Sequence, residues 1–242
     1  MTRSAYEHQI ESLRDDVVHM ASMVDKAITR SIDALRTQDV ALAHAVVAAD
    51  QEVNQQRWKV EEDALTTVAT QGPMARDLRM IVAAMHIVTD LERMADHAAG
   101  IAKIVIDIAD EPLLKPLVDI PRMSDLARSM LDESITAFIE LDAVAARGVA
   151  ERDDEVDGLY DQIYRELLTF MMSDPTTVAR ATRLLWAAHN IERIADRVTN
   201  ICERVLFTVT GDFEELGAGG SLAPFQRSSP VNTASSANGA SG

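Results

Sequence analysis

The sequence predicts an all-α protein built from two tandem three-helix bundles, that is, six long helices related by internal duplication. Three observations lead to this fold class. The 242 residues are 47% apolar but only 4% aromatic, and the helix-favouring residues Ala, Leu, Met, Glu and Arg are abundant up to about Leu216. The prolines before that point fall between long stretches of 3.6-residue periodicity. The order of elements in the first half also recurs in the second.

In the first half we expect helices at 5–37, 40–70 and 74–110. Asp39 is the expected N-cap of the second helix, because a short acidic side chain accepts hydrogen bonds from the free backbone N–H groups of a first turn. Gly72-Pro73 separates the second helix from the third, since neither residue favours continuation of a helix.

The second half repeats this pattern with expected helices at 119–141, 143–172 and 176–210. Asp142 is the equivalent N-cap, and Asp174-Pro175 separates the last two helices. Three prolines, Pro112, Pro116 and Pro121, mark the connection between the halves.

The duplication can be followed residue by residue. Asp50-Gln51-Glu52-Val53-Asn54 matches Asp153-Asp154-Glu155-Val156-Asp157 at an offset of 103, and the motif around Glu92 matches that around Glu192 at an offset of 100. A period of roughly 100 residues gives each copy enough chain for a core of its own. We therefore expect two bundles related by a pseudo-two-fold axis: residues 1–111, a proline-rich linker at 112–121, residues 122–216, and a disordered tail at 217–242.

Charge and composition exclude several classes of protein. The net charge of −16 would repel a phosphate backbone, so no nucleic-acid partner is expected. Cys202 is the only cysteine, which rules out an internal disulfide and fits a reducing compartment. The sequence shows no signal peptide and no apolar run of the roughly 18 residues that a membrane span needs. We expect a soluble cytoplasmic protein without membrane insertion.

Two acidic pairs occupy matching places on the third and sixth helices. Glu92 with Asp96, and Glu192 with Asp196, project roughly 150–190° away from the apolar stripe of their helix at 100° per residue. An isolated pair of this kind is usually a solvated helix face. Like charges at i,i+4 cost a few tenths of a kcal/mol, however, and this chain carries the pair twice.

Further acidic and amide residues on the second and fifth helices complete a candidate metal site in each half. Carboxylates that converge without matching Lys or Arg are unstable together unless a cation lies among them or some are protonated. Oxygen donors suit hard cations such as Mg, Ca, Mn or iron. The second half has one more carboxylate and is the stronger candidate. The expected ligands are Glu92, Asp96, Asp50 and Asn54 in the first half, and Glu192, Asp196, Asn200, Asp153 and Asp157 in the second.

Other interpretations of these acids remain open. Arg93, Arg193 and Arg197 lie along one edge of the acidic faces and are the main rivals to a metal as partners of the carboxylates. The sequence has no Gly-rich phosphate loop and no nucleophile with a base at a spacing typical of a catalytic pair. No catalytic residue is therefore expected. The alternatives are a carboxylate-bridged metalloenzyme, against which the missing Glu-x-x-His motif argues, and a metal-free helical interaction module.

The two acidic motifs resemble the signature of the PhoU family, the regulators of phosphate uptake in bacteria. They read Leu91-Glu92-Arg93-Met94-Ala95-Asp96 and Ile191-Glu192-Arg193-Ile194-Ala195-Asp196. The resemblance extends from residue 1 to about 216. The family usually has Gly where this chain has Ala95 and Ala195, and the first copy has Gly100 where the second has Asn200.

The resemblance implies a regulatory adaptor in phosphate homeostasis that is cytoplasmic and forms a homodimer. Such an adaptor exerts negative regulation on phosphate uptake and on the phosphate-starvation response. It does so by linking the ATPase subunit of a phosphate ABC transporter to a sensor histidine kinase of a two-component system. Some members carry multinuclear iron or zinc clusters on the carboxylate motifs. The cofactor expected here is therefore a divalent or trivalent metal ion: iron, zinc, Mn or Mg.

Overall fold

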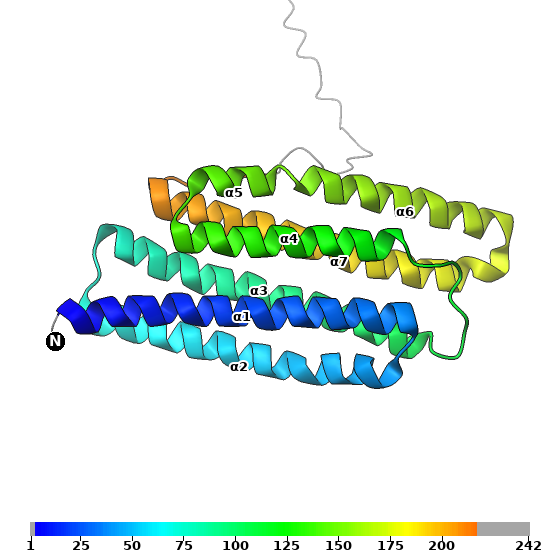
Figure 1. Cartoon of the computed structure of the whole chain (residues 1–242), viewed down its shortest axis with the longest axis horizontal. Coiled ribbons are helices and arrows are strands. Elements are labelled where there is room, and N and C mark those ends of the chain that lie inside the picture. Colours follow the sequence, from blue (N-terminus) through cyan, green and yellow to red (C-terminus); the bar gives the residue numbers. More distant parts are fainter. Residues whose placement is uncertain (1–2, 217–242) are drawn as a thin grey trace, which may run out of the picture.

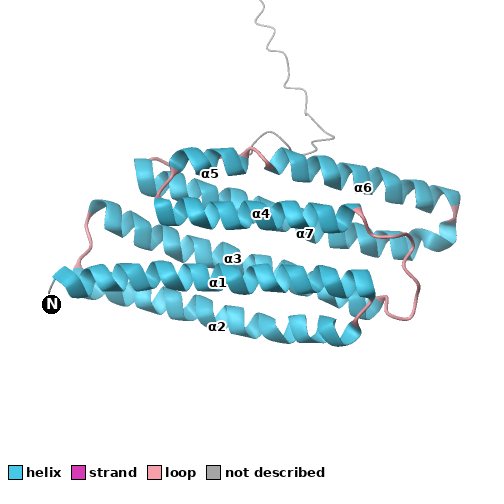
Figure 2. Cartoon of the chain, viewed as in Figure 1, coloured by secondary structure: helices cyan, strands magenta, loops and turns pink. Residues whose placement is uncertain are grey.

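The structure, a computed structural model, describes residues 3–216 as two stacked helical bundles (Figure 1). The expectation of a disordered tail at 217–242 lies outside the described residues. Figure 2 shows helices and loops throughout the described part, which contains no strand. The predicted all-α fold class is confirmed. The first bundle contains α1 (Arg3–Thr37), α2 (Val40–Gln71) and α3 (Ala75–Asp107), and the second contains α4 (Asp119–Glu140), α5 (Ala143–Ala150), α6 (Asp153–Ser173) and α7 (Val178–Thr210), with a 3₁₀ turn at Pro175–Thr177.

The prediction of one continuous helix at 143–172 is wrong. The segment is interrupted at Glu151 and Arg152 and forms two helices, α5 and α6. The residues after the break, 153–155, are all acidic and favour a new helix N-terminus, where the helix dipole is positive. Arg152 pairs with Glu133 of α4, with Nη1 and Oε1 2.5 Å apart. The second half thus gains a helix start at the position of Asp50 in the continuous α2.

The connection between the bundles also differs from the expected linker at 112–121. Helix α3 ends at Asp107, three residues before the predicted end, and α4 begins at Asp119. Pro121 therefore lies in the first turn of α4, where a missing backbone N–H breaks no intrahelical bond. Leu113, Leu114 and Leu117 of the connection pack against the core.

Both predicted N-caps are confirmed. The Asp39 carboxylate accepts a hydrogen bond from the backbone N–H of Leu42 at 2.9 Å, and Asp142 accepts two such bonds at 2.9 Å. The residue before each cap has a left-handed backbone, with φ of 54° at Gln38 and 56° at Leu141. The same turn is therefore built twice, at positions 103 apart.

The two bundles share one core, whereas we expected a core in each copy. The buried apolar side chains of both halves form a single cluster, because α3 packs along α7 and α1 along α4. Ala95 and Ala195, outside the predicted stripes, are buried as well. The predicted stripes themselves are all buried: Ile87, Leu91, Met94, Ala98, Ile101, Val105 and Ile108 on α3, and Ala187, Ile191, Ile194, Val198, Ile201 and Val205 on α7.

Polar contacts between α3 and α7 occur in exchanged pairs, as the expected two-fold relation requires. His97 Nδ1 lies 3.0 Å from Asn190 Oδ1, and Arg197 Nη1 lies 3.6 Å from Asp90 Oδ1. Each residue of the second contact is the offset-100 equivalent of a residue in the first. The pseudo-two-fold axis therefore passes between these contacts.

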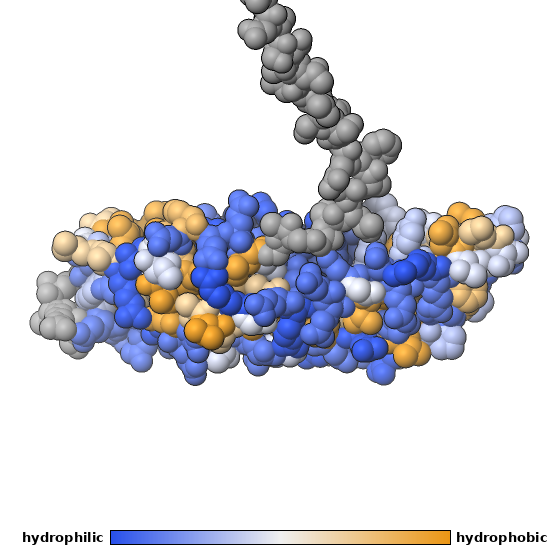
Figure 3. Space-filling model, turned by 90° about the horizontal axis from the view of Figure 1, so that it is seen from above, coloured by the Kyte–Doolittle hydropathy of each residue, from blue (hydrophilic) through white to orange (hydrophobic). Residues whose placement is uncertain are grey.

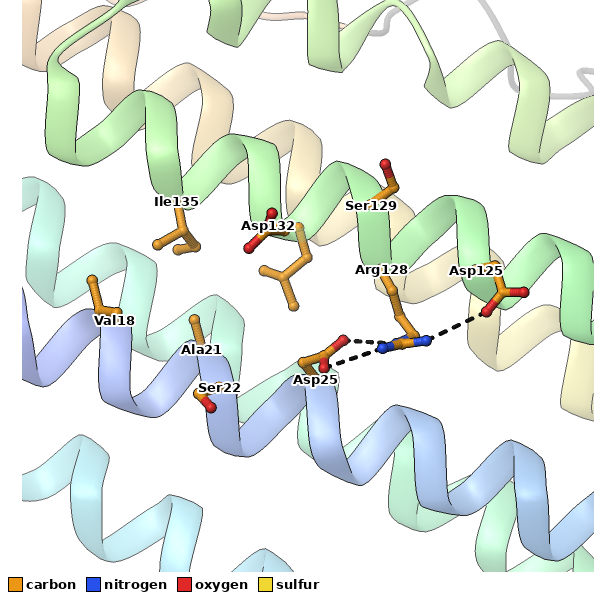
Figure 4. A pocket seen from close by; sticks show the side chains of 10 residues that line it. Val18, Ala21, Ser22, Asp25, Asp125, Arg128, Ser129, Asp132 and Ile135 are labelled. Carbon is orange, nitrogen blue, oxygen red and sulfur yellow. Dashed lines mark hydrogen bonds and ion pairs between the residues drawn. The ribbon is translucent and has the colours of Figure 1, made fainter.

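A second pair marks the axis on the opposite side of the molecule. Asp25 of α1 and Arg128 of α4 are offset-103 equivalents, and they form a two-bonded ion pair at 2.7 and 3.2 Å (Figure 4). The pair borders a cavity of about 540 Å³ between α1 and α4. Two equivalent positions have thus acquired opposite charges.

Because one core spans both halves, we expect the protein to unfold in one cooperative transition. Trp58 on α2 and Trp186 on α7 are each more than half exposed, and the variants Trp186→Phe and Trp58→Phe leave one reporter in each half. In each variant the urea-unfolding midpoint from fluorescence should equal the midpoint from far-UV circular dichroism. A fluorescence midpoint displaced from that of circular dichroism would show that the halves unfold separately.

The caps give a second prediction. Asp39→Ala and Asp142→Ala should each lower the free energy of unfolding by about 1 kcal/mol, because each removes the acceptor of first-turn N–H groups. Urea denaturation measures the loss. Asp39→Asn and Asp142→Asn keep an acceptor and should recover most of it, so equal losses in the Ala and Asn variants would contradict a capping role.

Candidate metal centre

Each half places carboxylates between two packed helices. The first-half cluster consists of Asp50 on α2 with Glu92 and Asp96 on α3. The second-half cluster consists of Asp153 and Asp157 on α6 with Glu192 and Asp196 on α7. Within each helix the acids are four residues apart and so share one face, and α2 packs on α3 as α6 packs on α7. The structure therefore brings these seven predicted residues into two groups.

The glutamates point away from the apolar stripes as expected, but they do not face open solvent. The side chains of Glu92 and Glu192 are only 17% and 16% exposed, because the neighbouring helix lies alongside. Asp96 remains exposed. The interpretation as a freely solvated helix face is therefore wrong for the two glutamates.

Burial and mutual repulsion disfavour the charged forms in the second-half cluster. Burial raises the pKa of Asp153 to about 7, with the charges of Asp196 and Asp157 adding to the effect. The pKa of Glu192 is also raised to about 7, by burial first and by Asp196 second. Burial and Asp196 raise the pKa of Asp157 in the same way. Asp196 thus acts on all three other members of the cluster.

Arg193 gives the second-half cluster partial compensation. Its Nε lies 3.2 Å from Glu192 Oε2, and its Nη1 donates to Asp196 Oδ2 at 2.9 Å. Within residues 3–216 it is the only Lys or Arg that forms an ion pair with this cluster. Glu192 Oε2 is buried and accepts no hydrogen bond of good geometry. Four carboxylates therefore share one arginine.

The first-half cluster has a cation built into α2. Arg57 Nη1 donates to Glu92 Oε1 at 3.1 Å, and the charge of Lys103 lowers the pKa of Asp50 against the raising effects of burial and Asp96. The expectation that no Lys or Arg matches the acids is wrong in this half. Arg57 can pair with Glu92 because it lies on the side of α2 that faces α3.

The two predicted asparagine ligands are placed differently, since Asn54 contacts its cluster and Asn200 contacts the other half. Asn54 Nδ2 donates to its own helix, to the backbone oxygen and the carboxylate of Asp50 at 3.3 and 3.4 Å. Asn200 Nδ2 donates to Asp90 Oδ1 at 3.3 Å, so it lies in the contact between α3 and α7. Asn200 therefore contacts the first half of the chain.

Gly100, the first-half equivalent of Asn200, lies beside the contact between His97 and Asn190. A Cβ at Gly100 would lie 3.0 Å from Asn190 Oδ1, closer than ordinary van der Waals contact. Glycine here allows α3 and α7 to approach while His97 holds Asn190.

The two clusters offer carboxylate donors but no preformed coordination site. Within residues 3–216, no three His, Cys, Asp or Glu side chains lie close enough together to hold a metal ion as they are placed. The second-half donor set nevertheless has the chemistry of a hard-cation site, since it offers only carboxylate oxygens, an excess of negative charge and a buried oxygen without a hydrogen bond. Coordination would require side-chain rotation, and the ligand assignment stays a prediction.

Sequence reasoning missed Arg57 and Lys103. A signal for both was present: the offset of 103 aligns Arg57 with Tyr160, and the offset of 100 aligns Lys103 with Glu203. Comparing the full repeats, rather than the acidic motifs alone, would have shown that the two halves differ in charge.

No helix within the described range has both the length and the apolar character needed to cross a bilayer. A family model described as the PhoU domain matches the chain twice, at residues 17–105 and 120–205. These two ranges correspond to the two bundles.

Known relatives cover most of the chain. It is 36% identical over 212 residues to the phosphate-specific transport system accessory protein PhoU homolog of Clostridium acetobutylicum, spanning 87% of this chain and 97% of that protein. The homolog of Aquifex aeolicus is 40% identical over 185 residues, covering 76% and 84% of the two chains. The crystal structure of PhoU from Pseudomonas aeruginosa superposes with a TM-score of 0.81 at 32% identity, covering 86% of this chain and all of that one. The chain belongs to the PhoU family.

Proposed function

We propose that this chain is a regulatory accessory protein of a phosphate-specific transport system and that it is not an enzyme. The observation that carries the proposal is the match of both halves to the PhoU domain. It is supported by relatives named as accessory proteins of phosphate-specific transport that align over most of their length.

The partners we propose are the ATPase subunit of a phosphate ABC transporter and a sensor histidine kinase, met in the cytoplasm by a homodimer of this chain. A net charge of −16 favours partners with basic surfaces. The face over α4–α7 is largely hydrophilic with separate apolar patches toward its ends (Figure 3). Exposed apolar side chains on these helices include Val144 and Met172, which suits docking of another protein.

We further propose that the second-half cluster binds a divalent or trivalent metal ion, such as iron, zinc, Mn or Mg. Asp153, Asp157, Glu192 and Asp196 would hold it. A bound ion would supply positive charge that offsets the repulsion among these carboxylates and would link α6 to α7. The Oε2 atom of Glu192, which is buried and accepts no hydrogen bond of good geometry, supports this assignment most directly.

The regulatory role predicts a cellular phenotype. Deleting the gene should raise phosphate uptake and the expression of phosphate-starvation genes in phosphate-replete medium, because a negative regulator is lost. Uptake of radiolabelled phosphate and transcript levels measure the effect, and the restored gene should reverse it. Unchanged uptake and transcription after deletion would contradict the proposal.

The metal proposal predicts a thermal shift. The protein should melt at a higher temperature with Mn²⁺ than with chelator, by the equivalent of roughly 2.7 kcal/mol at a hundredfold excess over Kd. Glu192→Gln with Asp196→Asn should raise the metal-free melting temperature and abolish the Mn²⁺ response, because two repelling charges and two ligands are removed. All melts are made at fixed ionic strength, since salt alone screens exposed charges.

The matched control is Glu92→Gln with Asp96→Asn in the first half. Equal Mn²⁺ shifts in the wild type and the second-half variant would refute the site. Oxygen consumption or phosphatase turnover by the metal-loaded protein would instead favour a carboxylate-bridged metalloenzyme. Unchanged stability and partner binding without metal would favour a metal-free interaction module.

A further inference from the structure

The two carboxylate clusters occupy equivalent places but have different charged neighbours. The duplication aligns Asn54 with Asp157 and Arg57 with Tyr160 at an offset of 103, and Lys103 with Glu203 at 100. In every one of these pairs the first-half residue is the more positive. The backbone was duplicated, but the electrostatic environment was not.

Arg57 is held firmly against the first-half cluster. Its Nη1 donates to Glu92 Oε1 at 3.1 Å across the helix pair, and its Nε lies 3.2 Å from Glu61 Oε1 on its own helix. The side chains of all three residues are mostly covered. Arg57 Nε forms no hydrogen bond of good geometry, so the hydrogen-bonded contact is the one with Glu92, and a partly buried ion pair is screened less than a surface pair. The guanidinium is thus a fixed positive charge beside Glu92.

Tyr160 stands beside Glu192 as Arg57 stands beside Glu92, but it supplies no charge. A phenol is uncharged near neutral pH, because its ordinary pKa is about 10. The ring centroid of Tyr160 lies 6.1 Å from that of His189. The second-half cluster therefore lacks the cation that its first-half equivalent contains.

We infer that Arg57 takes the place of a bound cation in the first half, so that the protein binds metal in its second half alone. This inference rests on the proposed metal site. A metal ion entering the first half would have to break the ion pair between Arg57 and Glu92. It would also approach the positive charges of Lys103, which acts on Asp50, and Arg93, which acts on Glu92. In the second half an incoming ion meets four carboxylates and the charge of Arg193. The accessory protein would thus have one metal-responsive half and one half with a permanent internal cation.

Exchanging the aligned residues tests the inference while every carboxylate is kept. Tyr160→Arg should lower the affinity for Mn²⁺ by about tenfold or more, because a fixed cation then competes with the metal. Arg57→Tyr should create Mn²⁺ binding in the first half, and adding Glu92→Gln to that variant should abolish it. Tyr160→Gln and Arg57→Lys are the matched controls, and both should bind Mn²⁺ as the wild type does. Isothermal titration and elemental analysis of dialysed protein give affinity and stoichiometry.

Metal-free melts provide a readout that does not depend on binding. In chelator, Tyr160→Arg should raise the melting temperature, because it adds a positive charge beside the second-half carboxylates. Arg57→Tyr should lower it, because it removes the positive charge beside the first-half carboxylates. If the wild type binds no Mn²⁺, the proposed metal site fails, but these opposite shifts would still support Arg57 as an internal cation.

Three results would overturn the inference. The first is equal loss of Mn²⁺ binding in the two double variants, Glu92→Gln with Asp96→Asn in the first half and Glu192→Gln with Asp196→Asn in the second. Another is wild-type affinity in Tyr160→Arg. The third is a shift of both metal-free melts in the same direction.

Discussion

Packing of α3 along α7 joins the two halves, and each of these helices carries an apolar stripe on one side and a glutamate–aspartate pair on another. Each fully buried Ile, Leu or Val of these stripes contributes roughly 1.5–3 kcal/mol, whereas a partly exposed ion pair such as Arg197 with Asp90 contributes at most about 1 kcal/mol. The apolar contact therefore holds the halves together. The polar contacts, with Gly100 opposite Asn190, specify the register at which the helices meet.

Duplication within one chain allows something that a symmetric dimer does not. In a dimer of identical chains, a position on the two-fold axis faces its own copy and carries the same charge. Here Asp25 and Arg128 are equivalent positions and form an ion pair on the axis. Arg57 and Tyr160 diverged in the same manner away from the axis. One architecture can therefore hold two clusters of different charge.

The sequence predicted much of the fold and only part of the candidate site. Apolar periodicity on α3 and α7 and the caps Asp39 and Asp142 were confirmed, because burial in a helix follows a local spacing and a cap acts within one turn. The acidic run at 153–155 was visible in the sequence, but the break before it was missed, because the pairing of Arg152 with Glu133 of α4 is a tertiary contact. The family itself was visible from two short motifs.

The sequence by itself determined that the chain is helical and duplicated, and which residues carry negative charge, since these are properties of spacing and composition. Only the tertiary structure decided which groups surround each acid. Asn200 shares a face of α7 with Arg197 and therefore meets α3, and Arg57 reaches Glu92 from another helix, 35 residues away in the chain. A pKa or an ion pair depends on through-space distance and burial, and neither quantity is encoded in the spacing of residues along one helix.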